Sequence, residues 1–170
     1  MAEILRVLML AALAGPGAAD DPGPAVSEAV VTASLEDVWA VWTTQEGLES
    51  CIVAQAEIDL KIGGLMRTHY DKHGRIGDGR TIENTILSYE PLRMLSIKVS
   101  KAPEGFPFPE ALRRMWTVIY FDPVAESRIR VRVVSLGFGP DEESRRLKAF
   151  FKAGNDATLK AMARRFETRK

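Results

Sequence analysis

The sequence has little of the chemistry that marks catalytic or metal-binding chains. Cys51 is the only cysteine among its 170 residues, so no disulfide can form within the chain. His69 and His73 are the only histidines, and basic and acidic side chains balance at 23 each. Because binding to nucleic acid calls for a basic domain, the zero net charge predicts no nucleic-acid partner.

The sequence also lacks an apolar run of the ~20 residues that a transmembrane helix needs, so we expect no integral membrane anchor. A short apolar run covers residues 7–14, after Arg6 and before small residues that end at Ala19. This order is typical of a secretory signal, and we predict a signal peptide over 1–19 and an exported protein, periplasmic or secreted. Glu3 favours the alternative of a cytoplasmic protein.

The rest of the chain has the composition of one folded domain, with 46% apolar and 27% charged residues. Residues 20–25 form a linker rich in proline and glycine, and residues 26–168 form the predicted domain. A domain of this length buries roughly 70% of its unfolded surface, which is enough for a core without disulfides.

Apolar and polar residues alternate in several segments, which predicts about six or seven strands. The clearest segment is 54–62, where Ile58, Leu60 and Ile62 share one face ahead of a predicted hairpin turn at Gly63–Gly64. The other predicted strands begin at Ala25 and cover residues 65–71, 80–89, 94–99, 115–121 and 128–136.

Helical spacing is found at two places. Ser34 is a predicted N-cap, followed by apolar residues at helical spacing and by a second short helix through Leu48 and Cys51. From Asp141 onward apolar residues recur every three or four positions, which predicts one amphipathic helix of roughly 25 residues.

Each predicted strand has one apolar face that another element must cover, and only the C-terminal helix is long enough to do so. The sequence therefore predicts an α+β fold in which a curved antiparallel sheet wraps around this helix. Because such a sheet is wider than a helix, we expect an apolar cavity between them.

Three segments, residues 31–48, 56–64 and 86–95, resemble the SRPBCC superfamily, which has the START-like, birch-pollen-allergen-like helix-grip fold. The most similar branch is that of the homologues of the activator of heat-shock-protein-ninety ATPase, and the resemblance covers about residues 26–168. It implies the helix-grip fold, with two short helices after the first strand. Members include lipid and steroid carriers and polyketide cyclases, so it implies no single function. Cys51 and Asn155 stand where aromatic residues are common, which prevents transfer of a particular ligand.

The candidate site is the lining of the predicted cavity, and it is almost wholly apolar. Its residues are Ile58, Leu60, Met66, Tyr70, Trp116, Val131 and Val133 from the sheet, and Phe150, Phe151, Gly154 and Met162 from the helix. Phe106 and Phe108 lie in a loop with three prolines and are predicted to be exposed and to gate the cavity.

Catalytic candidates are few. His69 and Tyr70, with Asp59 on the preceding strand, are the residues that could move a proton inside the cavity. We predict no metal site, because His69 and His73 lie in a strand and a turn, where their side chains do not converge. No nucleotide-binding loop or nucleophile elbow is present, and we expect no cofactor.

We therefore expect binding of a small hydrophobic or amphipathic molecule without catalysis. Two alternatives stay open. One is a cavity enzyme of the polyketide cyclase or hydratase type, in which His69 or Tyr70 acts. The other is a protein-interaction module like the chaperone activators, against which export from the cytoplasm would argue.

Overall fold

A computed structural model describes residues 23–167 as one seven-stranded antiparallel sheet with four helices. The predicted signal peptide lies outside the described residues. The elements are β1 (Ala25–Thr32), α2 (Leu35–Thr43), α3 (Gln45–Cys51), β2 (Gln55–Ile58), β3 (Leu65–His69), β4 (Ile82–Glu90), β5 (Met94–Lys101), α4 (Pro109–Arg114), β6 (Trp116–Ala125), β7 (Arg128–Leu136) and α5 (Glu142–Glu167).

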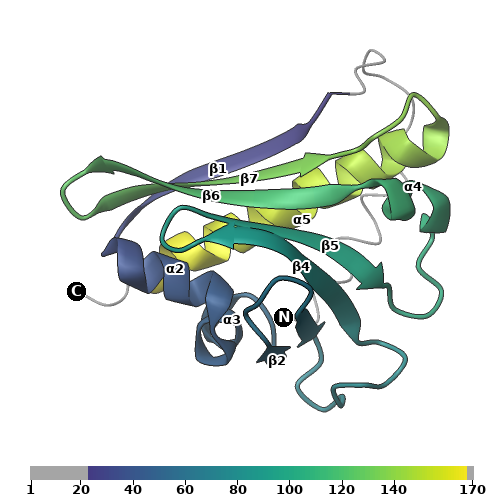
Figure 1. The fold of residues 1–170 in the computed structure, drawn as a ribbon, viewed down its shortest axis with the longest axis horizontal. Helices are drawn as coiled ribbons and strands as arrows, with labels where there is room; N and C mark the ends of the chain where they lie inside the picture. The colour runs from purple at the N-terminus through teal and green to yellow at the C-terminus, as the bar shows by residue number, and fades with distance from the viewer. Residues whose placement is uncertain (1–22, 168–170) are drawn as a thin grey trace.

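The strands lie in the order β1-β7-β6-β5-β4-β3-β2, and the sheet curves around α5 (Figure 1). α5 packs mainly along β1, with fewer contacts to β7, α3 and α4. We call the side of the sheet that faces α5 the concave face. The predicted α+β helix-grip architecture, with its two short helices after the first strand, is confirmed. None of the described helices is long and apolar enough to cross a membrane.

The register of the strands aligns their buried side chains on one face of the sheet. On β7, Val131, Val133 and Ser135 are buried on the concave face, and Arg130 and Arg132 lie on the convex face. Val133 is opposite Ile119 of β6, and Ile119 is opposite Leu95 of β5, so these residues share the concave face. The sequence-based assignment of Val131 and Val133 to the interior is confirmed.

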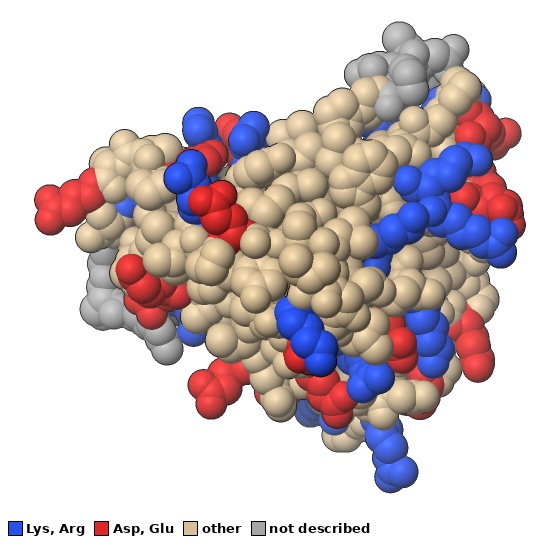
Figure 2. Space-filling view, in the orientation of Figure 1, with Lys and Arg blue, Asp and Glu red and all other residues tan. Residues whose placement is uncertain are grey.

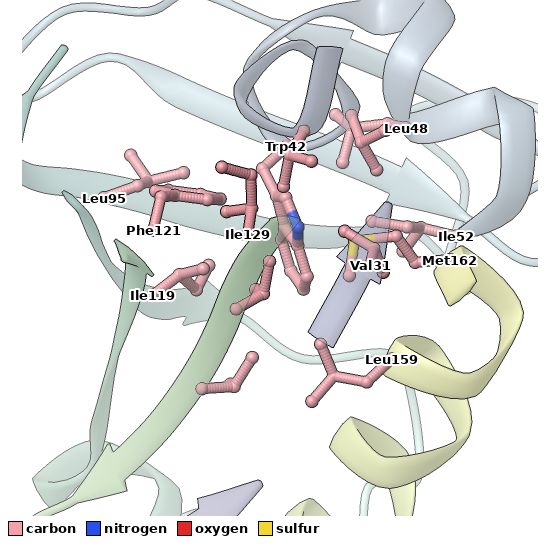
Figure 3. Packing of buried hydrophobic residues seen from close by; sticks show 14 of the residues in the cluster. Val31, Trp42, Leu48, Ile52, Leu95, Ile119, Phe121, Ile129, Leu159 and Met162 are labelled. Atoms are coloured by element: carbon pink, nitrogen blue, oxygen red, sulfur yellow. The ribbon is translucent and has the colours of Figure 1, made fainter. Parts of the chain in front are cut away.

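Two apolar clusters fill the two ends of the concave face. The first joins α2 and α3 to the sheet and to the C-terminal half of α5. Figure 3 shows Trp42 of α2 in its middle, between Ile119 of β6 and Met162 of α5. The second cluster lies around α4 and includes Phe108 and Leu147.

Local hydrogen bonds explain where the short helices begin. The Ser34 hydroxyl accepts a hydrogen bond from the Asp37 amide at 3.0 Å, which confirms Ser34 as the N-cap of α2. Thr44 ends α2 and caps α3, because its Oγ1 accepts a hydrogen bond from the Gly47 amide at 3.0 Å. The chain therefore turns between two helices with no intervening loop.

The predicted strand over 54–62 is too long. The ladder ends at Ile58, because the Lys61 amide donates to the Asp59 carbonyl at 2.8 Å and the Gly64 amide to the Lys61 carbonyl at 2.8 Å. These bonds form a tight turn in place of a ladder. Ile62, predicted to face the interior, is 72% exposed.

Two predicted cavity residues lie elsewhere. Trp116, predicted to line the cavity, is 37% exposed on the convex face, because Thr117 and Ile119 occupy the inward positions of β6. Uncharged surface runs over the middle of the sheet in this view (Figure 2). Phe108, predicted to be exposed, is 1% exposed at the start of α4, a helix that the sequence analysis missed. Phe106 is half-buried, with its ring centroid 5.7 Å from that of Phe108.

The β2 edge of the sheet is short and partly occupied. β2 has four residues, and its Ala56 amide donates to the Glu49 carboxylate of α3 at 2.9 Å. A backbone donor that an edge strand would otherwise present to another chain is thereby satisfied.

Gly47 provides a test of the α2–α3 packing. A Cβ atom at this position would lie 1.9 Å from the Ala40 carbonyl oxygen, so G47A must push the two helices apart. We expect a loss of about 1–3 kcal/mol in the free energy of unfolding, measured by urea denaturation. E46A, one residue earlier on the exposed side of α3, should cost about 1 kcal/mol or less. Equal losses in the two variants would contradict this account.

Candidate functional site

Between the two apolar clusters, the concave face is incompletely covered along β5, where Ile97 packs against the first cluster and Val99 against the second. Ile97 lies opposite Thr117 on β6, and the Thr117 hydroxyl is 3.2 Å from that of Ser135, so Ile97 points to the concave side. Val99 is two residues further along and has the same orientation. Both are half-buried, and β5 lies between β4 and β6, although its ladder with β6 ends at Ile97. Their partial exposure means that solvent reaches this part of the concave face.

α5 borders this region on the β7 side with residues that are themselves half-buried. They include Phe151, Gly154 and Asn155. The Asn155 side-chain amide donates to the Ser135 hydroxyl at 3.2 Å, which brings this part of α5 to β7. We call the region the concave groove and define it by Asn84, Ile97, Val99 and Thr117 of the sheet and Phe151 and Asn155 of α5.

The polar side chains of the groove are uncharged. Thr117 and Ser135 are buried and hydrogen-bonded to each other. Asn84 of β4 lies opposite Val99 and is 9% exposed, and its side-chain amide makes no hydrogen bond within residues 23–167. The side-chain amide therefore keeps some exposure to solvent.

The charged side chains of the strands lie on the other face. The register places on the convex face Glu57, Arg67, Glu83, Lys98, Asp122, Arg130 and Arg132. Several pair there with one another, such as Arg67 with Glu57 at 3.3 Å and Arg130 with Asp122 at 3.4 Å. The concave face therefore offers apolar walls and neutral hydrogen-bonding groups.

The structure distributes the predicted lining residues between the two clusters. Met66, Val131, Val133 and Met162 are buried in the first cluster, with Ile58, Leu60 and Tyr70 packed against it. Phe106, Phe150 and Phe151 pack against the second cluster, which contains Phe108. Gly154 is half-buried on α5. Thr117 and Ser135 were missed, although they occupy the same alternating positions as Ile119 and Val133.

Two hollows stand out in the described part of the chain, and neither is an apolar cavity of ligand size between sheet and helix. One, of about 470 Å³, lies on the β2–β3 hairpin and is lined by charged residues including Glu57, Lys61 and Arg67. The other, of about 80 Å³, lies between β1 and the end of α5, beside Phe166. Small-molecule sites commonly measure ~300–1,000 Å³, so the second is too small for a ligand.

The His69 side chain is hydrogen-bonded to the loop formed by residues 71–81. It is 1% exposed, with Nε2 3.1 Å from Asp78 Oδ1 and Nδ1 3.1 Å from the Asp71 amide nitrogen. Gly74 lies directly over the ring, since a Cβ there would be 1.9 Å from His69 Cε1. The histidine is thus a buried anchor for residues 71–81.

The three acid–base candidates do not converge. His69 and Tyr70 are adjacent in an extended segment, so their side chains point to opposite faces. Asp59 is paired with Lys61 at 2.7 Å and lies opposite Leu65, about 13 Å along β3 from His69. Burial raises the pKa of Tyr70, which favours its neutral form.

Cys51 and the histidines form no evident reactive or metal centre. Burial raises the pKa of the Cys51 thiol, against the weaker opposing effect of a hydrogen bond from Ser50, so the thiolate is disfavoured. Within residues 23–167, no three histidine, cysteine or acidic side chains are grouped as a metal would require.

The curved sheet, the long helix and the groove between them define a helix-grip domain. The chain belongs to the family described as activator of Hsp90 ATPase homolog 1-like protein, whose sequence pattern matches residues 32–167. No curated protein matches the chain.

Solved structures share this fold at low sequence identity. A protein from Mesorhizobium loti has a TM-score of 0.68 at 17% identity, over 86% of this chain and 98% of its own. An AHSA1-like protein from Aeromonas hydrophila has a TM-score of 0.62 at 16% identity, over 85% and 92%. The Zhui aromatase/cyclase from a Streptomyces species has a TM-score of 0.60 at 18% identity, over 86% and 94%. At these identities the likeness concerns the fold alone.

Asp78 provides a test of the loop around His69. Backbone hydrogen bonds from Arg80 and Arg75 hold the pKa of this carboxyl group below its usual value. A carboxyl group with a lower pKa in the folded chain stabilises the fold above its unfolded pKa of about 3.9, and this contribution is lost as the pH falls through the folded pKa. We therefore expect D78N to be less stable than the parent near pH 7.

The difference between D78N and the parent should narrow below about pH 4, as measured by urea midpoints at several pH values. E126Q, in the exposed turn between β6 and β7, is the control and should change the neutral-pH midpoint little. A D78N deficit that stays constant down to about pH 2 would contradict the assignment.

Proposed function

We propose that the protein binds a small hydrophobic or amphipathic molecule in the concave groove and does not transform it. The observation that carries the proposal is the partial exposure of Ile97 and Val99 on the concave side of an inner strand. Apolar side chains on the concave side of an inner strand are normally covered by the elements packed on that side. Here solvent reaches them between two well-packed clusters.

The groove has the composition of a binding site for such a molecule. Its walls are apolar, and a few polar groups converge on it from β4, β6 and α5. Covering the exposed apolar surface of Ile97, Val99 and Phe151 would contribute roughly 25 cal/mol for each Å² removed from water. This term favours an occupant with an apolar body.

Catalysis has less support than binding. His69 is fixed by Asp71 and Asp78 outside the groove, and Tyr70, on the opposite face, packs against the first cluster and is not among the residues that define the groove. A cyclase needs a positioned acid or base next to its substrate. The residues that define the groove are all uncharged and supply only amides and a hydroxyl, which are not acids or bases near neutral pH.

Export stays a proposal that depends on residues 1–19. If the predicted signal directs the chain out of the cytoplasm, the ligand is a molecule met in the periplasm or outside the cell. An activator-like role with a cytoplasmic chaperone is then the less favoured alternative.

The proposal predicts that the protein binds a neutral apolar dye such as N-phenylnaphthylamine in competition with any molecule that co-purifies with it. I97W places a large ring in the groove and should weaken dye binding at least about tenfold, by fluorescence titration. K98W adds the same ring on the convex face of the same strand and should bind like the parent.

Native mass spectrometry of gently purified protein provides the independent measurement. It should show a bound molecule that is lost in I97W and kept in K98W. Equal dye affinity in the two variants, with no co-purifying molecule in the parent, would exclude the groove as a binding site.

A further inference from the structure

We propose that the concave groove selects a neutral amphipathic ligand, with an apolar body and a hydroxyl or carbonyl group, over a fatty carboxylate. The inference rests on the proposed function and adds the chemical class of the ligand. Uncharged hydrogen-bonding groups face the groove, whereas the charged side chains of the strands lie on the convex face.

The first polar group is a short chain of hydrogen bonds between α5 and the sheet. Asn155 Nδ2 donates to Ser135 Oγ at 3.2 Å, and Ser135 Oγ is 3.2 Å from Thr117 Oγ1. The bond to Ser135 uses one end of the Asn155 amide. The other end has no partner within residues 23–167, and it is not among the fully buried polar atoms. This end is the carbonyl oxygen Oδ1, which can accept a hydrogen bond from a ligand hydroxyl.

The second polar group lies on the other side of the apolar strip. Asn84 on β4 is two strands away from Thr117, and Ile97 and Val99 lie between them on β5. At ~4.8 Å for each strand spacing and ~3.4 Å for each residue along a strand, the two polar groups are about 12 Å apart. A ligand with an apolar body over Ile97 and Val99 therefore has an uncharged hydrogen-bonding partner at either end.

Charge is absent from the sheet wall of the groove. All groove-facing residues of β4, β5 and β6 are neutral, because the alternation puts Glu83, Lys98 and Asp122 on the convex face. A carboxylate that loses water without gaining a cation is far more costly to bury than a hydroxyl that gains a hydrogen bond. The sheet therefore disfavours an anionic head group.

The two lysines that precede Asn155 on its side of α5 are engaged. Lys152, one turn before Asn155, is bonded to Asp156, so a carboxylate would have to compete with a carboxyl group already in place. Lys148, a further turn away, also takes part in an interaction within the protein. These contacts leave the neutral amides as the groups presented to a ligand.

The test compares decanol with decanoate at about pH 8, where decanoate is ionised. The two probes share a chain length and differ in the head group. Competition against N-phenylnaphthylamine should give decanol an affinity at least about tenfold higher than that of decanoate. N155L removes the amide and should weaken decanol several-fold with little effect on decanoate.

T117V gives a second variant of nearly unchanged shape, in case N155L disturbs the packing of α5. Removal of the Thr117 hydroxyl takes one member out of the hydrogen-bonded chain that holds the Asn155 amide. It should therefore also lower the preference for decanol over decanoate. T85V is its matched control, because Thr85 lies on the convex face of β4 between Leu65 and Lys98, and it should keep the parental preference.

The outcomes separate the two proposals. If decanoate binds as tightly as decanol, the neutral-ligand inference is wrong and binding in the groove stands. If both probes displace the dye but N155L and T117V leave the preference unchanged, the polar groups named here do not select the ligand. If neither probe nor the dye binds, the proposed function fails and this inference fails with it.

Discussion

A single helix has to cover a sheet much wider than itself, and the rest of the structure follows from this mismatch. Seven strands spaced ~4.8 Å apart make a sheet about 29 Å wide, whereas a helix with its side chains is about 10–12 Å across. α5 therefore covers β1 and part of β7. The remaining strands need other elements to cover their concave side, and the short helices α2, α3 and α4 do so.

α2 and α3 cover one end of the concave face through Trp42 and Leu48, and α4 with Phe108 covers the other. Between them, Ile97 and Val99 have only partial cover, and the residues beside them are asparagine, threonine and serine. Buried hydroxyl groups such as those of Thr117 and Ser135 need partners. These two bond each other, and Ser135 also accepts a hydrogen bond from Asn155. These hydrogen bonds satisfy the two buried hydroxyl groups without a ligand.

The fold could be predicted from the sequence because its evidence is local. Alternation in β7, helical spacing in α5 and the Ser34 cap each depend on neighbouring residues, and all three predictions were confirmed. The resemblance of residues 31–48 to a known superfamily identified the same architecture, and the matching family confirms it.

The site was less predictable because it depends on which face each strand turns inward. Trp116 and Thr117 differ by one position, and a shift of one residue exchanges the faces of the whole strand. Hydrophobicity favoured Trp116, but the pairing of Thr117 with Ser135 decides the orientation. Similarly, two prolines beside Phe108 indicated an exposed loop, because the apolar cluster that buries this ring is formed by residues distant in the sequence, such as Phe138 and Leu147.

The bond between Glu49 and the Ala56 amide has a consequence for solubility. An edge strand can recruit a strand from another molecule only through donors and acceptors that are still unpaired. At Ala56 the donor is already taken by a carboxylate, which also brings a negative charge to the approach path. Glu49 therefore disfavours the pairing of β2 with a strand of another molecule, and this effect matters most at high protein concentration.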